Sequence, residues 1–225
     1  MKNKNIIAFI LSFFVILLVL LKSVDYQTFD TEYYKKFQKE NAIDKEAGKT
    51  LEELEKINQK LVYFIQSGKE EHLVEDFNTR EISHMKDVYN LYSLSSKVQT
   101  GIEIVLFLLL IYFAKKGRLL EVLKKSVKYI FIILGIILIL ILLISTNFSE
   151  AFTLFHKIFF DNDLWILDPS TDLMIRMLPE QFFMGMAIQI MIKFIKGIII
   201  YLLLVAFLNK FYKCGGNTCN IQEAE

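Results

Sequence analysis

The chain has 225 residues, of which 54% are hydrophobic, and its formal net charge at pH 7 is +1. Its several long apolar runs exclude an ordinary soluble enzyme and indicate a polytopic membrane protein. A net charge this close to zero gives no indication of a nucleic-acid partner.

Four apolar runs are predicted to cross the membrane: Ile6–Leu21, Ile102–Ala114, Tyr129–Ser145 and Phe194–Phe211. A helix needs about 20 residues to cross roughly 30 Å of hydrocarbon, so the second span is expected to begin earlier, near Val98. The first run follows Lys2 and Lys4, but no A-x-A cleavage site comes after it. This pattern predicts an uncleaved anchor rather than a signal peptide.

The basic residues predict how the spans are oriented. Segment 115–128 carries six Lys or Arg against one Glu, whereas segment 146–188 carries two basic residues against six acidic ones. Since short cytoplasmic loops are enriched in Lys and Arg, the first segment is expected inside and the second outside, with both termini cytoplasmic. Cys214 and Cys219 in the final tail are then expected to be free thiols.

The expected fold is an all-α integral membrane protein with four transmembrane helices, a small extracytoplasmic helical subdomain and an outer loop that returns to the membrane. In chain order we expect transmembrane helix 1 (1–22), an extracytoplasmic helical lid (23–97), transmembrane helices 2 and 3 with a basic cytoplasmic loop (98–145), an extracytoplasmic interfacial loop (146–188), transmembrane helix 4 (189–212) and a cytoplasmic tail (213–225).

Two helices are expected in the lid, over 33–42 and 50–66, and Thr50 with Glu53 has the spacing of a capping box. Asn78 is predicted to cap a further helix. Because no Pro or Gly interrupts the pattern until residue 101, that helix is expected to continue into the second span.

His84 lies on this third helix, on the outer side of the membrane. Arg80, Glu81 and Asp87 are four residues before, three before and three after it, so all three are expected on its helix face. A carboxylate beside an imidazole fixes the tautomer and raises the basicity that a general base needs. The alternative is an ordinary histidine in a solvated charge network.

His156 belongs to the stretch FHKIFFDNDLWILDP, residues 155–169, on the same side of the membrane. Aromatic rings in this stretch are expected to hold it at the membrane interface. Either Asp168 or Asp172 is expected to form an ion pair with Arg176 that braces the loop. His72 stands among acidic residues in KEEHLVED and is expected at the surface.

The motifs leave a limited choice of chemistry. No G-x-S-x-G, H-E-x-x-H or outward-facing Cys is present, which disfavours a Ser or Cys acyl-enzyme and a zinc protease. His156 and Asp161 spell H-x4-D, a short motif typical of glycerolipid acyltransferases. The interpretation that remains is acid–base chemistry on a lipid-borne substrate, without a covalent intermediate. No cofactor is expected; two histidines with nearby carboxylates could bind a metal, but the spacing names no third ligand, so no metal ligand is assigned.

The segments REISHMKDVY and FHKIFFDNDLWILDPSTDLMIRMLPEQFF, on a frame of four spans, resemble the lipoprotein intramolecular transacylase (Lit) family of bacterial membrane proteins. The resemblance covers nearly the whole chain except the lid at about 30–66. It implies transfer of the sn-2 acyl chain of a diacylglyceryl-cysteine lipoprotein to the α-amino group of the same cysteine, giving a lyso-form lipoprotein.

The resemblance places the two functional histidines at His84 and His156. We expect His84 to be the base that deprotonates the cysteine ammonium, and His156 to hydrogen-bond at the reacting centre. The residues expected to position substrate or to brace the site are Arg80, Glu81, Asp87, Asp168 and Arg176.

The expected partners are diacylglyceryl lipoproteins and membrane lipid, at the extracytoplasmic face of the bacterial cell membrane. Two other functions stay open at this point. One is an acyltransferase that uses an external phospholipid donor, and the other is a non-catalytic membrane module that binds a partner or senses pH.

Overall fold

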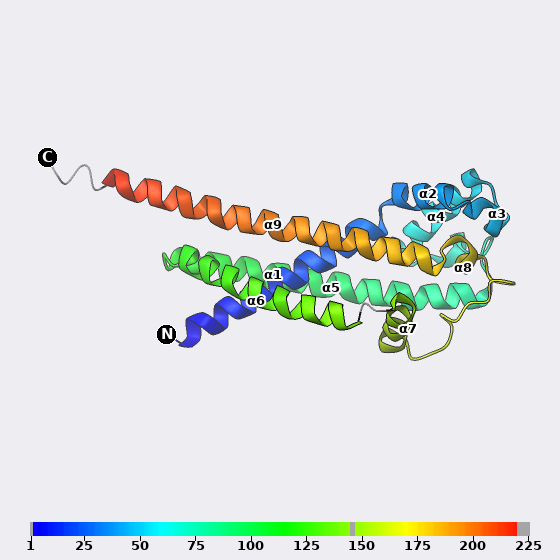
Figure 1. The fold of residues 1–225 in the computed structure, drawn as a ribbon, viewed down its shortest axis with the longest axis horizontal. Helices are drawn as coiled ribbons and strands as arrows, with labels where there is room; N and C mark the ends of the chain where they lie inside the picture. The colour runs from blue at the N-terminus through cyan, green and yellow to red at the C-terminus, as the bar shows by residue number, and fades with distance from the viewer. Residues whose placement is uncertain (1, 145–146, 220–225) are drawn as a thin grey trace. The chain divides into compact units, whose positions relative to one another are not determined.

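The computed structural model describes the backbone of residues 2–144 and 147–219, and the side chains of 5–139 and 147–212. Over these residues all the regular structure is helical, which confirms the all-α prediction (Figure 1). The helices are α1 (Lys2–Thr28), α2 (Thr31–Glu40), α3 (Ile43–Ala47), α4 (Leu51–Ser67), the short 3-10 helix η1 (Glu70–His72), α5 (Thr79–Lys115), α6 (Leu119–Ile144), α7 (Phe148–Phe159), α8 (Leu173–Met177) and α9 (Glu180–Cys219).

Three helices in the described part of the chain are long and apolar enough to cross a membrane: Asn5–Thr28, Thr79–Lys115 and Glu180–Tyr212. The remaining predicted span lies in α6, and its last residue, Ser145, is outside the described residues. A fourth span therefore stays a prediction. The side chains of Cys214 and Cys219 are also outside the description.

The chain divides into two compact units. The first contains Met1–Ser23, Gln99–Leu142 and Ile192–Glu225, and the second contains Val24–Val98 and Leu143–Met191.

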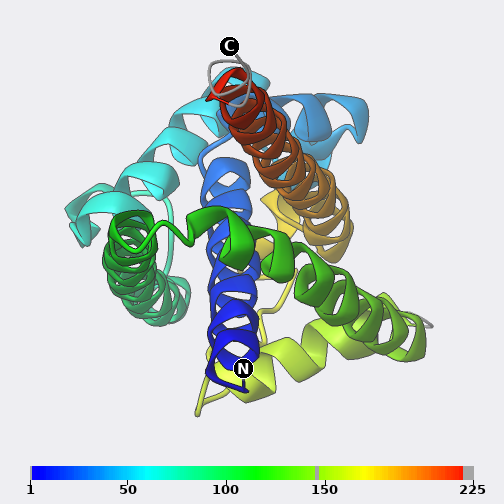
Figure 2. The same cartoon turned by 90° about the vertical axis from the view of Figure 1, so that its left-hand side faces the viewer.

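The first unit is built from parts of α1, α5, α6 and α9, with α1 among the other three (Figure 2). Its buried core takes Leu11 from α1, Phe113 from α5, Ile130 from α6 and Ile198 from α9. Polar groups also join the helices, because Ser126 Oγ lies 2.6 Å from Tyr201 Oη. Hydrogen bonds of this kind hold helices together where the surroundings are apolar.

The second unit has its own core, formed mainly by the apolar face of α4. Leu54, Leu61 and Phe64 are fully or almost fully buried on that face. Thr50 accepts from the backbone of Glu53 and Glu53 from that of Thr50, which confirms the predicted capping box. These local features are those that the spacing of apolar and capping residues dictates.

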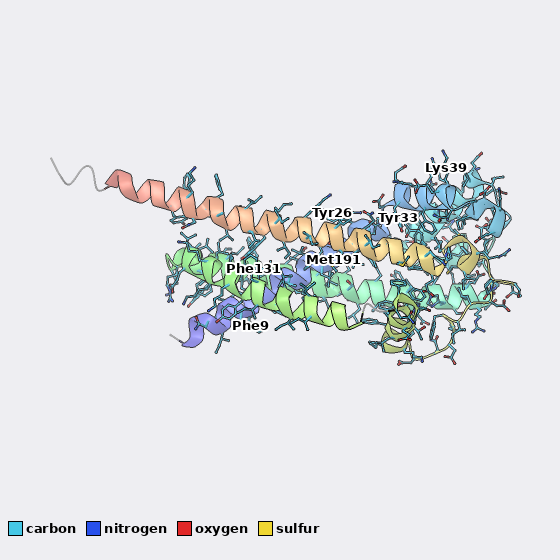
Figure 3. The ribbon with its side chains drawn as sticks, viewed as in Figure 1. Phe9, Tyr26, Tyr33, Lys39, Phe131 and Met191 are labelled. Carbon is cyan, nitrogen blue, oxygen red and sulfur yellow. The ribbon has the colours of Figure 1, made fainter. Side chains whose placement is uncertain are left out.

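The lid is tied to the beginning of α9 within this second unit. Tyr33, labelled in Figure 3, donates its hydroxyl to the carbonyl of Phe182 at 2.8 Å. Gln38 and Asn58 exchange hydrogen bonds between their buried side-chain amides, and Gln38 also donates to the Met177 carbonyl. Buried amides that are satisfied in this way fix the register of α2 against α4 and α8.

Helix α5 is continuous over 37 residues, which confirms that the predicted helix after Asn78 runs on into the second span. The side chain of Asn78 accepts from the backbone N–H groups of Arg80 and Glu81, as an N-cap does. The apolar part of α5 begins near Val98, so residues 79–97 precede the membrane-spanning segment.

Candidate active site

The structure brings the two predicted histidines together in the second unit. His84 comes from the second turn of α5 and His156 from the last turns of α7, and their ring centroids are 6.0 Å apart. Both side chains are buried, at 8% and 7% exposure. Two imidazoles 72 positions apart in the sequence thus share one enclosed site.

Aromatic rings line this site. The indole of Trp165 stacks on His156 with centroids 4.8 Å apart and 27° between the planes. Phe152 meets the His156 ring edge-on at 4.4 Å, and Phe160 lies 5.3 Å from His84 and 5.6 Å from His156. We call these five residues the ring site. The rings restrict both imidazoles to narrow orientations and keep water away from them.

A backbone hydrogen bond fixes the tautomer of His156. Its Nδ1 lies 2.7 Å from the carbonyl oxygen of Phe152, one turn earlier in α7. Because a carbonyl only accepts, Nδ1 carries the proton and Nε2 keeps a free lone pair when the ring is neutral. Burial lowers the pKa of His156, and the bond to Phe152 partly opposes that shift. The neutral form with Nε2 as an acceptor therefore dominates at neutral pH.

His84 differs because its Nδ1 is buried and has no hydrogen-bond partner among the described residues. Burial lowers the pKa of His84 to about 4, with a further decrease from His156 and a partial increase from Asp87. An imidazole with this pKa stays neutral at physiological pH and holds one N–H that can donate a hydrogen bond.

Glu81 makes no hydrogen bond or ion pair with either histidine in the described structure, although it was expected beside His84. It is 1% exposed, and its carboxylate accepts from the backbone N–H groups of Asn78 at 2.8 Å and Met174 at 2.6 Å. Burial raises its pKa, in opposition to these two hydrogen bonds. Glu81 thus joins the beginning of α5 to the beginning of α8.

Asp172 completes this second polar cluster. Its carboxylate accepts from the side chains of Asn78 and Thr171 and from the backbone N–H of Asp168. We call Asn78, Glu81 and Asp172, with the backbone groups they bind, the polar tether. It holds α5, α8 and the 168–172 turn together.

Neither expected ion pair, of Asp168 or of Asp172 with Arg176, is formed among the described residues. Arg176 Nε donates instead to the backbone carbonyl of Asp172 at 3.2 Å. The Asp168 carboxylate accepts from the backbone and side chain of Ser170, which closes a turn after Pro169. The two residues stabilise the same loop, but through backbone contacts rather than through each other.

Arg80 and Asp87 reach the 160–165 segment from α5. Arg80 Nη2 donates to the carbonyl of Asp163 at 2.7 Å, and Asp87 accepts from the side chain of Asn162 at 2.9 Å. Asp87 therefore acts on His84 through its charge and makes no direct hydrogen bond to it in the described structure. His72 is exposed, as expected, and lies on η1.

Several residues of the site were not singled out in the sequence analysis. Trp165 and Phe160 were expected only as membrane-interface anchors, and the parts played by Asn78 and Asp172 in the tether were not foreseen. Trp165 is the only tryptophan in the chain, which is a usable signal. No group of three or more His, Cys, Asp or Glu that could hold a metal occurs in the part of the chain that the structure describes.

The fold and the site together define a class of protein: a helical membrane protein with a buried pair of neutral histidines. The sequence profile of the lipoprotein intramolecular transacylase Lit matches residues 9–183. The chain therefore belongs to the Lit family of transacylases.

Solved structures share the fold. The in meso structure of the membrane integral lipoprotein intramolecular transacylase Lit from Bacillus cereus is 25% identical, covers 95% of this chain and 99% of that chain, and has a TM-score of 0.81. Two structures of the same Bacillus cereus protein, each with one histidine substituted, are 22% and 23% identical and cover 95% of this chain. These two matches extend over 95% and 96% of the Bacillus cereus chains, each with a TM-score of 0.80. No curated protein matches the chain significantly.

Proposed function

We propose that this protein moves the sn-2 acyl chain of a diacylglyceryl-cysteine lipoprotein to the α-amino group of the same cysteine, using the ring site. The observation that carries the proposal is the pairing of His84 and His156, with ring centroids 6.0 Å apart, in a buried aromatic enclosure. Family membership supports the same reaction class, since Lit enzymes are transacylases.

The reaction needs no nucleophile from the protein. The substrate amine attacks its own ester carbonyl through an eight-membered ring made of the nitrogen, two cysteine carbons, sulfur, two glycerol carbons, the ester oxygen and the carbonyl carbon. The new C–N bond replaces the C–O bond to glycerol, and one proton passes from nitrogen to the departing oxygen. The enzyme has to fold the substrate, exclude water and carry that proton.

His156 is the better candidate to carry the proton, although His84 was expected from the sequence to be the base. The bond from its Nδ1 to the Phe152 carbonyl leaves Nε2 free to accept and partly restores its basicity. Nε2 takes the proton as the C–N bond forms and the nitrogen becomes acidic, then returns it to the glycerol oxygen. The same imidazole serves both halves of the reaction.

His84 is better suited to stabilise charge on the carbonyl oxygen. With a pKa of about 4, it is a poor base for an amine, but while neutral it has an N–H that can donate a hydrogen bond. A neutral imidazole with a lowered pKa can polarise a carbonyl without itself being ionised. Donation from His84 to the developing oxyanion would then lower the barrier to attack.

Helix α7 supports a location at the membrane surface. Around the buried His156, this helix exposes four large apolar side chains, Leu154, Phe155, Ile158 and Phe159, to between 45% and 64%. An amphipathic helix of this kind lies at the boundary between headgroups and acyl chains. Together with the charge bias of the loops, this supports an active site at the extracytoplasmic face, open to a substrate that is itself in the bilayer.

An acyltransferase of the H-x4-D type is less well supported. In such a dyad the aspartate would orient the histidine, but Nδ1 of His156 is already bonded to the Phe152 carbonyl. Asp161 follows the end of α7 and is exposed, and within the described residues no hydrogen bond joins it to His156.

The reaction is tested with the purified protein in detergent and a synthetic diacylglyceryl lipopeptide, without other lipid. Mass spectrometry is expected to show an unchanged total mass, with one acyl chain moved from glycerol to the N-terminal amide. A gain of one chain that requires added phospholipid would instead establish an external donor. An unmodified lipopeptide under both conditions would favour the binding module.

A further inference from the structure

A groove on the first unit lies between α6 and α9 and has a volume of about 320 Å³. It is remote in sequence from the ring site and plays no part in the proposed acyl transfer. The residues that line it are Lys124, Val127, Phe131, Leu202, Val205, Ala206 and Asn209.

The lining changes character along its length. On α6 it runs from Lys124 to the apolar Phe131, labelled in Figure 3, and on α9 it runs back from Asn209 to the apolar Leu202. These stretches of α6 and α9 run in opposite directions (Figure 1). Each helix therefore contributes its polar residue at the end of the groove near the basic 115–128 segment and its apolar residues further along.

Two polar groups at that end have capacity to bind a ligand. Asn209 Oδ1 is buried and has no hydrogen-bond partner among the described residues. No ion pair includes Lys124 in the described structure, whereas the next residue, Lys125, pairs with Glu121. A buried acceptor without a partner is costly, and a donor from a ligand would satisfy it.

We propose that this groove binds an anionic glycerophospholipid with hydroxyl groups in its headgroup, in the leaflet on the side of the basic loop. Lys124 would contact the phosphate, Asn209 would accept from a headgroup hydroxyl, and an acyl chain would lie along Val127, Phe131 and Val205. The arrangement of a cation, a polar acceptor and an apolar channel in that order matches such a lipid from headgroup to chain. The predicted cytoplasmic side of segment 115–128 assigns the lipid to the inner leaflet.

Native mass spectrometry of the full-length protein in detergent tests the proposal, with phosphatidylglycerol and phosphatidylcholine of identical chains titrated separately. Phosphatidylcholine has neither net charge nor a headgroup hydroxyl. We expect phosphatidylglycerol to bind at least about fivefold more tightly, and Lys124→Gln or Asn209→Leu to remove that preference. Lys116→Gln, an exposed residue of the same basic loop that does not line the groove, is the matched control and should retain it.

Each of three other results would overturn the proposal. Equal binding of the two lipids would show that the groove has no headgroup preference. Equal losses in Lys116→Gln and Lys124→Gln would show a general effect of positive charge. Competition by glycerol phosphate at the same concentration as the lipid would show a soluble phosphate ligand that does not need the apolar part. Acyl transfer in the lipopeptide assay is a separate measurement, so failure here leaves the proposed function standing.

Discussion

The ring site and the polar tether begin one turn apart on α5, at His84 and Glu81, yet they are built in opposite ways. In the tether, the carboxylates of Glu81 and Asp172 accept hydrogen bonds from backbone and side-chain donors. In the ring site, one hydrogen bond orients His156 and the remaining contacts are with aromatic rings. Carboxylates whose oxygens already accept hydrogen bonds stabilise the fold. Neutral imidazoles that still have a nitrogen without a hydrogen-bond partner can bind a substrate. We therefore predict that substitutions in the ring site reduce the rate of acyl transfer, whereas substitutions in the polar tether, one turn earlier on α5, reduce the stability of the fold.

The largest expected effect is on rate, and it comes from the ring site. His84→Ala and His156→Ala should abolish formation of the lyso-form product while the protein still inserts and purifies normally. Glutamine separates the two roles, because it can donate a hydrogen bond but cannot take up a proton. We expect His156→Gln to reduce kcat by about 10³-fold or more, and His84→Gln by about 10²-fold.

The lipopeptide assay gives kcat for each variant, and the fluorescence of Trp165, the only tryptophan, reports whether the ring site is intact. Only His84→Gln is expected to leave that fluorescence unchanged, since Trp165 stacks on His156. If His84→Gln were the more damaging of the two, the base would be His84, as expected from the sequence. Full turnover by either alanine variant would remove that histidine from the mechanism.

The second effect is on stability, and it comes from the tether. Glu81→Ala leaves the partly buried backbone N–H of Asn78 and the buried backbone N–H of Met174 without their acceptor, so it should reduce the free energy of unfolding by about 3 kcal/mol. Glu81→Gln keeps the shape and one acceptor and should cost roughly half as much. Thermal unfolding followed by circular dichroism measures both.

For the same two variants, kcat per folded molecule should stay within a few-fold of wild type. This rate measurement is what tests the separation of the two regions. A Glu81→Gln protein that unfolds like wild type but has lost most of its turnover would show that the carboxylate takes part in the chemistry.

The sequence predicted the local parts of this arrangement well and the long-range parts poorly. Asn78 was expected to cap α5, because a cap acts on donors within a few residues of itself. The bond from Glu81 to the Met174 backbone crosses 93 positions, and no spacing rule signals it. Glu81 was consequently expected to face His84, which lies on the next turn.

The outer loop shows the same limit. Residues 148–159 form the helix α7, which was not predicted within the expected interfacial loop. An ion pair of Arg176 with Asp168 or Asp172 was expected from charge alone, but Arg176 donates to the backbone carbonyl of Asp172, one turn earlier. A carboxylate and a nearby backbone carbonyl compete for the same arginine, and only the three-dimensional path of the chain decides which of them binds it.

The third effect is the pH dependence of stability. His84 binds its proton near pH 6.5 when unfolded and near pH 4 when folded, so the unfolded state holds more protons between these values. Stability from this group is therefore present above pH 6.5 and is lost as the pH falls, by about 2 kcal/mol between pH 7 and pH 5. His156 acts in the same direction, and Glu81, whose pKa is raised, acts in the opposite one.

Comparison with His84→Gln isolates the contribution of His84, because the other two groups remain. Thermal unfolding at pH 7 and pH 5 should show a smaller difference for this variant than for wild type. Equal slopes for the two proteins would mean that His84 titrates normally and is not enclosed by rings.

The smallest effect is expected from Asp87, which shares a property with each of the two regions. It is a carboxylate, but it reaches His84 only through its charge while accepting from Asn162. Asp87→Asn keeps an oxygen that can accept from Asn162, so the fold should be unchanged. Loss of the negative charge should move the pKa of His84 further down, visible by NMR of the three imidazoles.

If His84 works as a neutral donor, kcat changes by less than about threefold. A tenfold decrease that follows the lowered pKa would instead make His84 the base, since a base loses rate as its pKa falls.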